Sequence, residues 1–407
     1  MQTGLVRAIE TTADYLADSP ECSLTFCAGD SFEALGGCLA SLKNHPRLRD
    51  IPLACSQIDA ALEKTMQRLN RTIEENGKQN YGLRAARKTL RSAGKWLRAG
   101  RAPLDAKHLR LAQIFHSPFL PIPMAAHQTR GLRVFLTVHD LIPEFFPELC
   151  HDGAPAMLNA TLRSLKPDDW VLCVSKATRN DLCNHLPHLD PKKVLVIYHG
   201  ASEGFYPCKD PVTIAGVRNK YGIPEGPYIL SLSSLEPRKR LDHLVHCFAR
   251  MVQEQNISDL NLVLAGPKGW KYEKIFERLT EHSDIEKRII LTGFVDDNDL
   301  PALYSGALAF AYPSLYEGFG LPVLEAMQCG VPVITSNTSS LPEVAGSAGI
   351  MVNPKDSDAL CQAMLNIYGN PALRSQLAKN ALERSKQFSW QKSADETICA
   401  YKMALHG

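Results

Sequence analysis

The feature that most constrains the fold of this chain is a regular alternation of short apolar runs with helical patterns in its C-terminal half. The predicted strands are 228–232, 262–265, 289–292, 307–312 and 331–334. The predicted helices include 241–252, 299–305 and 322–329. A parallel sheet that is covered on both faces needs strands that are short, largely apolar and separated by helices. The C-terminal half is therefore predicted to be an α/β domain.

The N-terminal half shows the same alternation less regularly, with predicted strands at 134–138, 170–174 and 194–198. A proline-containing loop at 205–207 precedes the next set of strands and marks the predicted domain boundary. The 407 residues suffice for two domains of ordinary size. We predict two Rossmann-like α/β domains that face a central cleft, at 1–205 and 206–387, followed by a helix at 388–407 that packs back towards the N-terminal domain.

Composition argues against several classes of protein. A formal net charge of +2 gives no support to nucleic-acid binding. The twelve cysteines form no C-x-x-C pair and no cluster with histidine at metal-ligand spacing, a pattern typical of reduced thiols in the cytoplasm. There is no signal-peptide pattern at the N-terminus, and no apolar run approaches the roughly 20 residues that span a bilayer. We expect a cytoplasmic protein that contacts a membrane, if at all, only peripherally at its inner face.

Residues 78–101 stand out by charge, with eight lysines and arginines and no acidic residue. Leucines and alanines recur among them at helical spacing, which predicts a helix with a narrow apolar stripe. Two interpretations stay open. The helix either packs this stripe on its own domain or lies as a basic amphipathic helix on an anionic membrane or another anionic partner.

A turn that suits phosphate binding follows the predicted strand 307–312. Its sequence is Glu317-Gly318-Phe319-Gly320-Leu321-Pro322-Val323-Leu324-Glu325. Glycines allow a ligand to approach the backbone closely, and proline is tolerated in the first turn of a helix. The N-terminal end of the following helix attracts anions without needing a basic side chain. Gly330 is placed where this helix should end.

The two carboxylates of this segment lie on opposite sides of the predicted phosphate site. Glu317 is on the loop before the helix and can accept hydrogen bonds from hydroxyls beyond the phosphates. Glu325 is inside the helix, within reach of a ribose on the nucleoside side. A ligand with hydroxyls on both sides of a pyrophosphate is a nucleotide sugar. The alternative is an ordinary strand–turn–helix in which Glu325 is only a surface residue.

These residues resemble the E-x7-E element of the retaining glycosyltransferases of family 4, which have the GT-B fold. The similarity extends through 325–334 and 341–344 and includes 235–239 and 291–295. It is weaker between 116 and 207 and poor before 116. The resemblance implies that the C-terminal domain binds a nucleotide-sugar donor and that the N-terminal domain lies on the acceptor side.

The resemblance also assigns roles to single residues. Arg238 and Lys239 would hold the donor pyrophosphate and neutralise the charge that grows on the departing phosphate. Lys239 is the favoured one, because Arg238 could equally serve a structural ion pair. Phe294 and Val295 end a strand on the nucleobase side. Many relatives carry an arginine where Ser233 stands here, so part of the phosphate clamp is expected to differ.

The acidic run Asp296-Asp297-Asn298-Asp299 is tempting as a metal site but is more typical of helix capping. Asp and Asn favour N-cap positions, and a helix is predicted to begin near Leu300. Enzymes of this fold resemble one another in not needing a divalent ion. We therefore expect no metal and no cofactor.

In the N-terminal half, His139 follows a predicted strand at the end where open α/β sheets place ligands. It matches the histidine that family members keep beside the sugar and the acceptor, and the implied role is orientation of both. A purely structural histidine is the alternative.

Relatives usually begin with a strand and a glycine-containing loop that touches the donor phosphates. Residues 2–7 look like that loop without the strand, which makes Gly4 a candidate donor contact.

The sequence thus predicts transfer of a sugar from a nucleoside diphosphate to a hydroxyl of a glycan or lipid-linked acceptor, with retained anomeric configuration. The segments 236–239 and 139–143 resemble bacterial mannosyltransferases of polysaccharide and lipopolysaccharide assembly, which favours GDP-mannose as donor. A UDP-sugar is the first alternative. The second is a protein that binds a nucleotide sugar or glycan without catalysis.

Overall fold

A computed structural model describes residues 4–27, 45–54, 64–66, 68–73, 81–98, 106–269 and 283–407. The chain forms two compact units. Unit 1 consists of Met1–Ala8, Thr137–Asn159 and Val171–Glu396, and unit 2 of Ile9–Leu136, Ala160–Trp170 and Thr397–Gly407. The boundaries 1–205, 206–387 and 388–407 stay predictions.

Unit 1 contains a six-stranded sheet in the order β12-β11-β10-β7-β8-β9, parallel throughout. Its strands are β7 (Tyr228–Leu232), β8 (Asn261–Ala265), β9 (Ile289–Gly293), β10 (Ala309–Tyr312), β11 (Val333–Ser336) and β12 (Gly349–Val352). The chain runs from β7 outward to β9 and then returns to β10 beside β7 before it runs to the other edge. This is the doubly wound arrangement, with its reversal point between β7 and β10.

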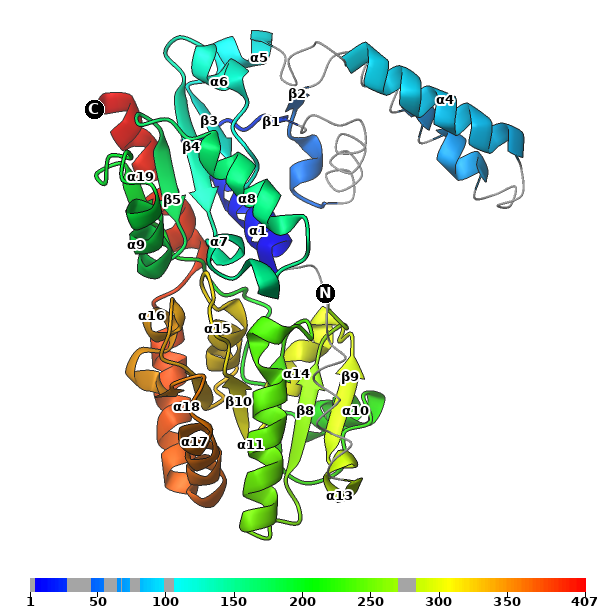
Figure 1. The fold of residues 1–407 in the computed structure, drawn as a ribbon, viewed down its shortest axis with the longest axis vertical. Coiled ribbons are helices and arrows are strands. Elements are labelled where there is room, and N and C mark those ends of the chain that lie inside the picture. Colours follow the sequence, from blue (N-terminus) through cyan, green and yellow to red (C-terminus); the bar gives the residue numbers. More distant parts are fainter. Residues whose placement is uncertain are drawn as a thin grey trace. The chain divides into compact units, whose positions relative to one another are not determined.

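Helices cover both faces of this sheet. They are α10 (Pro211–Lys220), α11 (Leu241–Glu254), α13 (Ser283–Glu286), α14 (Leu300–Ser305), α15 (Leu321–Gln328), α16 (Leu341–Ala345), α17 (Ser357–Gly369) and α18 (Pro371–Ser385). Figure 1 shows α11 lying across one face, where Ile229 and Leu264 belong to its core cluster. On the other face the ring of Tyr304, from α14, packs 5.4 Å from Phe310. Burial on both faces explains why the strands are continuous apolar runs.

A four-stranded sheet in the order β3-β4-β5-β6 comes from the N-terminal half of the chain. Its strands are β3 (Ile114–Ser117), β4 (Arg133–Val138), β5 (Trp170–Cys173) and β6 (Val194–Val196), with β3 parallel to β4 and β5 parallel to β6. The strands β1 (Phe26–Cys27) and β2 (Leu53–Ala54) form a separate parallel pair. The helices of this half are α1 (Gly4–Asp18), α4 (Tyr81–Arg98), α5 (Ala106–Leu111), α6 (Met124–Gln128), α7 (Ile142–Phe145), α8 (Ala154–Arg163) and α9 (Lys176–His185), and α19 (Trp390–His406) closes the chain.

Several predicted boundaries were wrong by a few residues. The strand predicted at 331–334 is β11 at Val333–Ser336, because proline lacks the N–H that a strand ladder needs, and Pro332 contributes only its carbonyl, to Phe310 N at 2.9 Å. The strand predicted at 307–312 begins at Ala309, since Ala307 N still closes a turn onto Tyr304 O. The strand predicted at 194–198 ends at Val196.

Candidate active site

The strand order creates one position where a ligand is expected. Doubly wound sheets bind ligands at the carboxyl ends of the two strands where the order reverses, here β7 and β10. The 3-10 helix η3 (Pro237–Lys239) follows β7, and the loop that contains Glu317 follows β10. A hydrogen bond from Leu315 N to Arg238 O, 3.0 Å long, joins the two loops.

Lys239 and Glu317 meet at this position. The Nζ atom of Lys239 donates to Glu317 Oε1 at 2.7 Å and to the hydroxyl of Tyr312 at 2.6 Å. Ser314 Oγ donates to the same carboxylate oxygen at 2.6 Å. Both charged residues are buried, at 9% exposure for Lys239 and 8% for Glu317. The fold therefore brings together the two residues on which the predicted site depends.

Protein groups already bind the guanidinium of Arg238, so this side chain is not free to bind a phosphate. Its Nη1 lies 2.8 Å from Glu317 Oε1 and donates to Tyr316 O at 2.6 Å. Its Nη2 donates to Glu236 Oε1 at 2.6 Å. These contacts fix the guanidinium, so in this structure Arg238 forms the structural ion pair that the sequence left open.

The charges of this cluster shift one another's titration. Burial by itself would raise the pKa of Glu317, but the Arg238 and Lys239 cations outweigh it and lower the pKa to about 2. Burial lowers the pKa of Lys239, and repulsion by Arg238 adds to this, while Glu317 opposes it. Burial raises the pKa of Asp140 against the attraction of Arg238. Because a nearby negative charge favours the charged form of a lysine, an incoming anion would stabilise the Lys239 cation as the neighbouring carboxylates do.

The glycines of the turn allow two close approaches. A Cβ atom at Gly318 would lie 2.0 Å from the carbonyl oxygen of His139. Gly320 has a φ of 109°, and a Cβ there would meet Leu341 Cδ2 at 2.8 Å. The helix α15 begins at Leu321 directly after it and stops before Gly330, whose φ is 71°. The predicted turn and helix stop are therefore present.

The ring of His139 is connected to the turn by a series of neighbouring aromatic rings. Its ring centroid is 5.5 Å from that of His199, which is in turn 5.4 Å from Phe319 and 5.2 Å from Trp390. Burial and the neighbouring His139 lower the pKa of His199 well below its ordinary value. His199 is therefore a neutral spacer between His139 and the turn at neutral pH.

Glu325 is buried on the inner side of α15. It accepts a hydrogen bond from the hydroxyl of Tyr304 at 3.1 Å and forms an ion pair with Arg7. Burial raises the pKa of Glu325, and Arg7 and Tyr304 oppose this rise. The guanidinium of Arg7 also lies 5.7 Å from the ring centroid of Phe205.

Two sequence predictions about loops need correction. Gly4 does not belong to a loop, because it is the first residue of α1, whose helical pattern continues to Asp18. Asp299 occupies the N-cap position of α14, which begins at Leu300 as predicted, but neither Asp296 nor Asp299 makes a capping hydrogen bond through its side chain. Both carboxylates bind Lys220 Nζ instead, at 2.6 and 2.7 Å, because α10 brings this cation to them.

The predicted nucleobase-side residues follow β9. The side chain of Phe294 is 50% exposed, whereas that of Val295 is fully buried.

At the end of β7, Ser233 Oγ is buried and, within the described ranges, has no hydrogen-bond partner. Gly266 lies beside it, since a Cβ there would be 2.0 Å from Ser233 O. An unpaired buried hydroxyl at the carboxyl end of a central strand is a feature that a polar ligand would satisfy.

Sequence reasoning assigned no role to several residues that the fold brings here: Asp140, His199, Glu236, Tyr312 and Ser314. Each follows or ends a predicted strand, or flanks the basic pair, so strand ends were the signal that could have found them. Asp140 Oδ1 accepts a hydrogen bond from Ile142 N at 2.9 Å.

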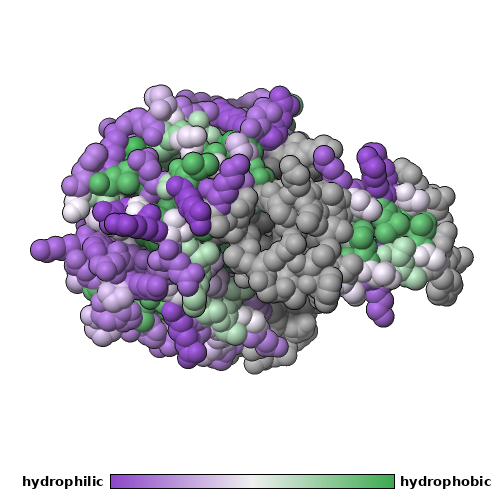
Figure 2. Space-filling view, turned by 90° about the horizontal axis from the view of Figure 1, so that it is seen from above, coloured by the Kyte–Doolittle hydropathy of each residue, from purple (hydrophilic) through white to green (hydrophobic). Residues whose placement is uncertain are grey.

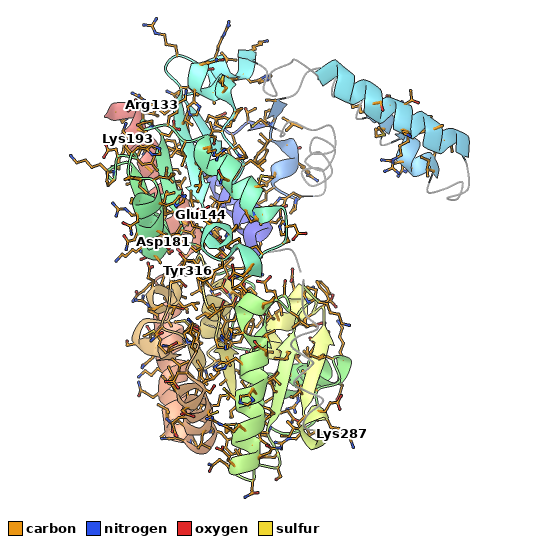
Figure 3. All side chains as sticks on the ribbon, viewed as in Figure 1. Arg133, Glu144, Asp181, Lys193, Lys287 and Tyr316 are labelled. Atoms are coloured by element: carbon orange, nitrogen blue, oxygen red, sulfur yellow. The ribbon has the colours of Figure 1, made fainter. Side chains whose placement is uncertain are left out.

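Beyond the turn, Tyr316 lies beside α7 and α9, as Figure 3 shows with Glu144 and Asp181. Its hydroxyl donates to Asp181, and its ring lies 6.3 Å from that of Phe145. Thr178 Oγ1 lies 3.4 Å from both His139 O and Gly318 O. The residues around the turn are thus held from several elements.

The basic segment 78–101 contains α4 at Tyr81–Arg98, which confirms the predicted helix, while 78–80 and 99–101 lie outside the described residues. Figure 2 shows hydrophilic and apolar residues side by side on it. Lys88 is exposed, whereas Leu83 and Leu90 are half-buried. Among the described residues, no helix has both the length and the apolar character needed to cross a membrane.

Comparison with known proteins decides the family. The model of "Glycosyl transferases group 1" matches residues 215–384, and that of "Glycosyltransferase Family 4" matches 69–203. O-antigen chain mannosyltransferase B of Escherichia coli is 34% identical over 294 residues, which cover 71% of this chain and 74% of the relative. The chain belongs to glycosyltransferase family 4. This glycosyltransferase is also 36% identical over 271 residues to the serotype-specific mannosyltransferase WbdA of Escherichia coli, of whose length it spans 33%.

Solved structures share the fold of the glycosyltransferase. HepE of Anabaena, crystallised with UDP and glucose, has a TM-score of 0.64 at 17% identity, with 99% of this chain and 97% of that chain covered. Sucrose-phosphate synthase of Thermosynechococcus elongatus has a TM-score of 0.58 at 24% identity, with 73% and 75% covered. These neighbours support the predicted GT-B fold.

Proposed function

We propose that this glycosyltransferase moves mannose from GDP-mannose to a hydroxyl of a glycan or lipid-linked acceptor, with retained anomeric configuration and without a metal ion. The observation that carries the proposal is the cluster of Lys239, Arg238 and Glu317 at the carboxyl ends of β7 and β10, beside the Gly318 turn. It joins the Lys239 cation, for a diphosphate, to a carboxylate for sugar hydroxyls that Arg238 holds in place.

In this proposal the diphosphate binds where Lys239 reaches the turn, and Ser233 Oγ gains a partner there. As the bond between sugar and phosphate breaks, negative charge grows on the leaving phosphate, and the Lys239 ammonium stabilises it. Arg238 positions Glu317, which stays ionised because its pKa is about 2 and accepts hydrogen bonds from the sugar. His139 orients the sugar and the attacking hydroxyl, and the leaving phosphate takes the acceptor proton as the hydroxyl attacks from the same face.

The choice of mannose rests on the names of the relatives, two of which are mannosyltransferases of Escherichia coli. The name of one of them, O-antigen chain mannosyltransferase B, supports a glycan acceptor. A UDP-sugar is the alternative donor, since HepE of Anabaena was crystallised with UDP and glucose. A lipid-linked acceptor would suit contact between 78–101 and the inner face of a membrane.

The test is transfer by the purified chain with a panel of GDP- and UDP-sugars and a mannose-terminated acceptor. We expect selective release of GDP from GDP-mannose and an α-linked product by NMR, since GDP-mannose is the α-anomer. Lys239→Ala and Glu317→Ala should each lower kcat/KM by about a hundredfold or more. Lys220→Ala is the matched control, because its exposed cation pairs with Asp296 and Asp299 away from the turn.

Each alternative has its own outcome. Release of UDP from a UDP-sugar alone would replace the donor and leave the site in place. Saturable donor binding without release of any nucleoside diphosphate would identify a binding protein. Full activity of both the Lys239 and the Glu317 variants would refute the site, and a β-linked product would refute retention.

A further inference from the structure

Two cysteines in the core of unit 1 take no part in the proposed reaction. Cys247 lies on α11 and Cys361 on α17, and both belong to one buried cluster, at 0% and 8% exposure. The thiol of Cys361 donates to the carbonyl oxygen of Cys247 at 3.3 Å. The two thiols are close enough that each shifts the pKa of the other. Their sulfur atoms are therefore neighbours in the native fold.

The surroundings make the two thiols unequal. The Cys361 pKa is lowered, chiefly by the hydrogen bond from Cys247 and, against the effect of burial, by the Arg250 guanidinium. The Cys247 pKa is raised by the same hydrogen bond and by burial. Cys247 Sγ lies 3.6 Å from Ser357 O and 3.9 Å from His243 Nε2. Cys361 is thus the thiol of the pair that ionises more readily, and Cys247 is the partner that stays protonated.

Other cysteines of the described chain provide a contrast. Burial raises the pKa of each of Cys22, Cys150, Cys173 and Cys329. A thiol with a raised pKa is a poor first nucleophile towards an oxidant, whereas a thiol with a lowered pKa next to a second thiol has the arrangement of a resolving pair.

We propose that Cys247 and Cys361 form a redox-sensitive dithiol that a peroxide converts into an intramolecular disulfide between α11 and α17. The Cys361 thiolate attacks one oxygen of hydrogen peroxide, the O–O bond breaks, and Cys361 becomes a sulfenic acid. The hydroxide that leaves takes the proton of Cys247 and becomes water. The Cys247 thiolate then attacks the Cys361 sulfur, and the S–O bond breaks.

The second hydroxide takes up the proton that Cys361 had released, so two thiols and one peroxide give one disulfide and two waters. The dithiol loses two electrons and the peroxide gains them. The bond would tie α17 to α11, which begins at Leu241, two residues after Lys239. It would also close the long chain segment between positions 247 and 361, which restricts the unfolded state.

The experiment uses the full chain, reduced, freed of reductant and treated with hydrogen peroxide. Remaining thiols are then alkylated in denaturant, and the digest is analysed by mass spectrometry. We expect one dominant linked peptide pair containing Cys247 and Cys361, reversed by dithiothreitol, and a melting temperature about 5 °C higher in the oxidised protein. Cys361→Ser and Cys247→Ser should each abolish the shift, and Arg250→Gln should slow oxidation at least about threefold.

Cys173→Ser is the matched control, because Cys173 is also buried and its substitution should leave the linked pair intact. Recovery of both Cys247 and Cys361 as alkylated thiols after peroxide treatment overturns the proposal. A disulfide between either one and a different cysteine does so equally. If a serine variant fails to fold, the linked peptide of the unsubstituted chain decides the question alone. None of these outcomes depends on transferase activity.

Discussion

At the scale of single residues, Glu317 shows how a buried carboxylate is kept ionised. Donors from Lys239, Arg238 and Ser314 converge on its Oε1 atom, so the cost of burial is outweighed by two cations and a hydroxyl. An incoming diphosphate would compete with Glu317 for the same cations. The cluster is therefore both a structural feature of the free protein and the predicted donor site.

The pH dependence of stability tests this balance. The folded pKa of Glu317 is about 2, below its ordinary value of 4.5, so its contribution is present above pH 4.5 and is lost as the pH falls towards 2. We expect Glu317→Gln to lower the free energy of unfolding by about 3 kcal/mol at pH 7 and by much less near pH 2.5. Urea unfolding at a series of pH values measures this difference.

The control is Glu383→Gln, which removes one partner of an exposed pair with Lys386. Exposed pairs of this kind contribute little, so its effect should stay within about 0.5 kcal/mol over the same range. A cost of Glu317→Gln that does not change with pH would mean that its carboxylate is not stabilised by the two cations.

At the scale of elements, the turn before α15 depends on the absence of side chains. A Cβ at Gly318 would meet a backbone carbonyl, which cannot move aside as a flexible side chain could. We expect Gly318→Ala to displace the turn, lower the melting temperature by several degrees and reduce transfer by about a hundredfold or more. Thermal unfolding and initial rates at saturating donor measure both effects.

Gly216, inside α10, is the matched glycine because nothing lies within 4 Å of a Cβ placed there. Gly216→Ala should therefore stabilise the protein by about 0.5–1 kcal/mol and leave transfer unchanged. Equal melting temperatures and equal transfer rates for the two alanine variants would show that the close approach at Gly318 affects neither stability nor transfer.

The helix α4 tests the prediction of membrane contact. Arg87 and Lys88 lie next to each other on it. If this surface binds an anionic membrane, the double variant Arg87→Glu/Lys88→Glu should reduce co-sedimentation with phosphatidylglycerol vesicles at least about tenfold, since each basic residue contributes about 1 kcal/mol. Lys355→Glu/Lys386→Glu changes the net charge equally, and similar losses for both pairs would reject α4 as the contact.

At the scale of the whole molecule, unit 1 gathers chain segments that are far apart in the sequence. Glu343, from α16, accepts hydrogen bonds from the backbone N–H groups of Lys176 and Ala177 at the start of α9, both at 2.8 Å. It also accepts one from the hydroxyl of Tyr198 at 2.8 Å. A carboxylate at a helix N-terminus satisfies groups that the helix itself leaves unpaired.

We expect Glu343→Ala to lower the free energy of unfolding by about 2–4 kcal/mol, because it leaves three donors without their acceptor. Tyr198→Phe removes one of these bonds and should lower it by about 1 kcal/mol. Denaturant titration of the two variants and of the double variant measures their coupling. A Glu343 variant no less stable than the Tyr198 variant would show that the contact with α9 contributes nothing.

The sequence by itself determined the α/β class, the helix after the Gly318 turn and the candidate residues Lys239, Glu317 and Glu325. Strand periodicity, proline and glycine act within a few residues, so these features can be read from local pattern. The same pattern misplaced Gly4, which lies in a helix, and it did not reveal that the carboxylates of Asp296 and Asp299 bind the distant cation of Lys220.

Only the tertiary structure decided that β7 and β10 are neighbours, that Arg238 is committed to Glu236 and Glu317, and that Cys247 meets Cys361. Strand order and helix packing depend on the burial of surfaces contributed by segments far apart in the chain, and no local pattern encodes which of them meet. Burial in turn sets the titration of Glu317 and Lys239, because the cost of a charge depends on what surrounds it after folding.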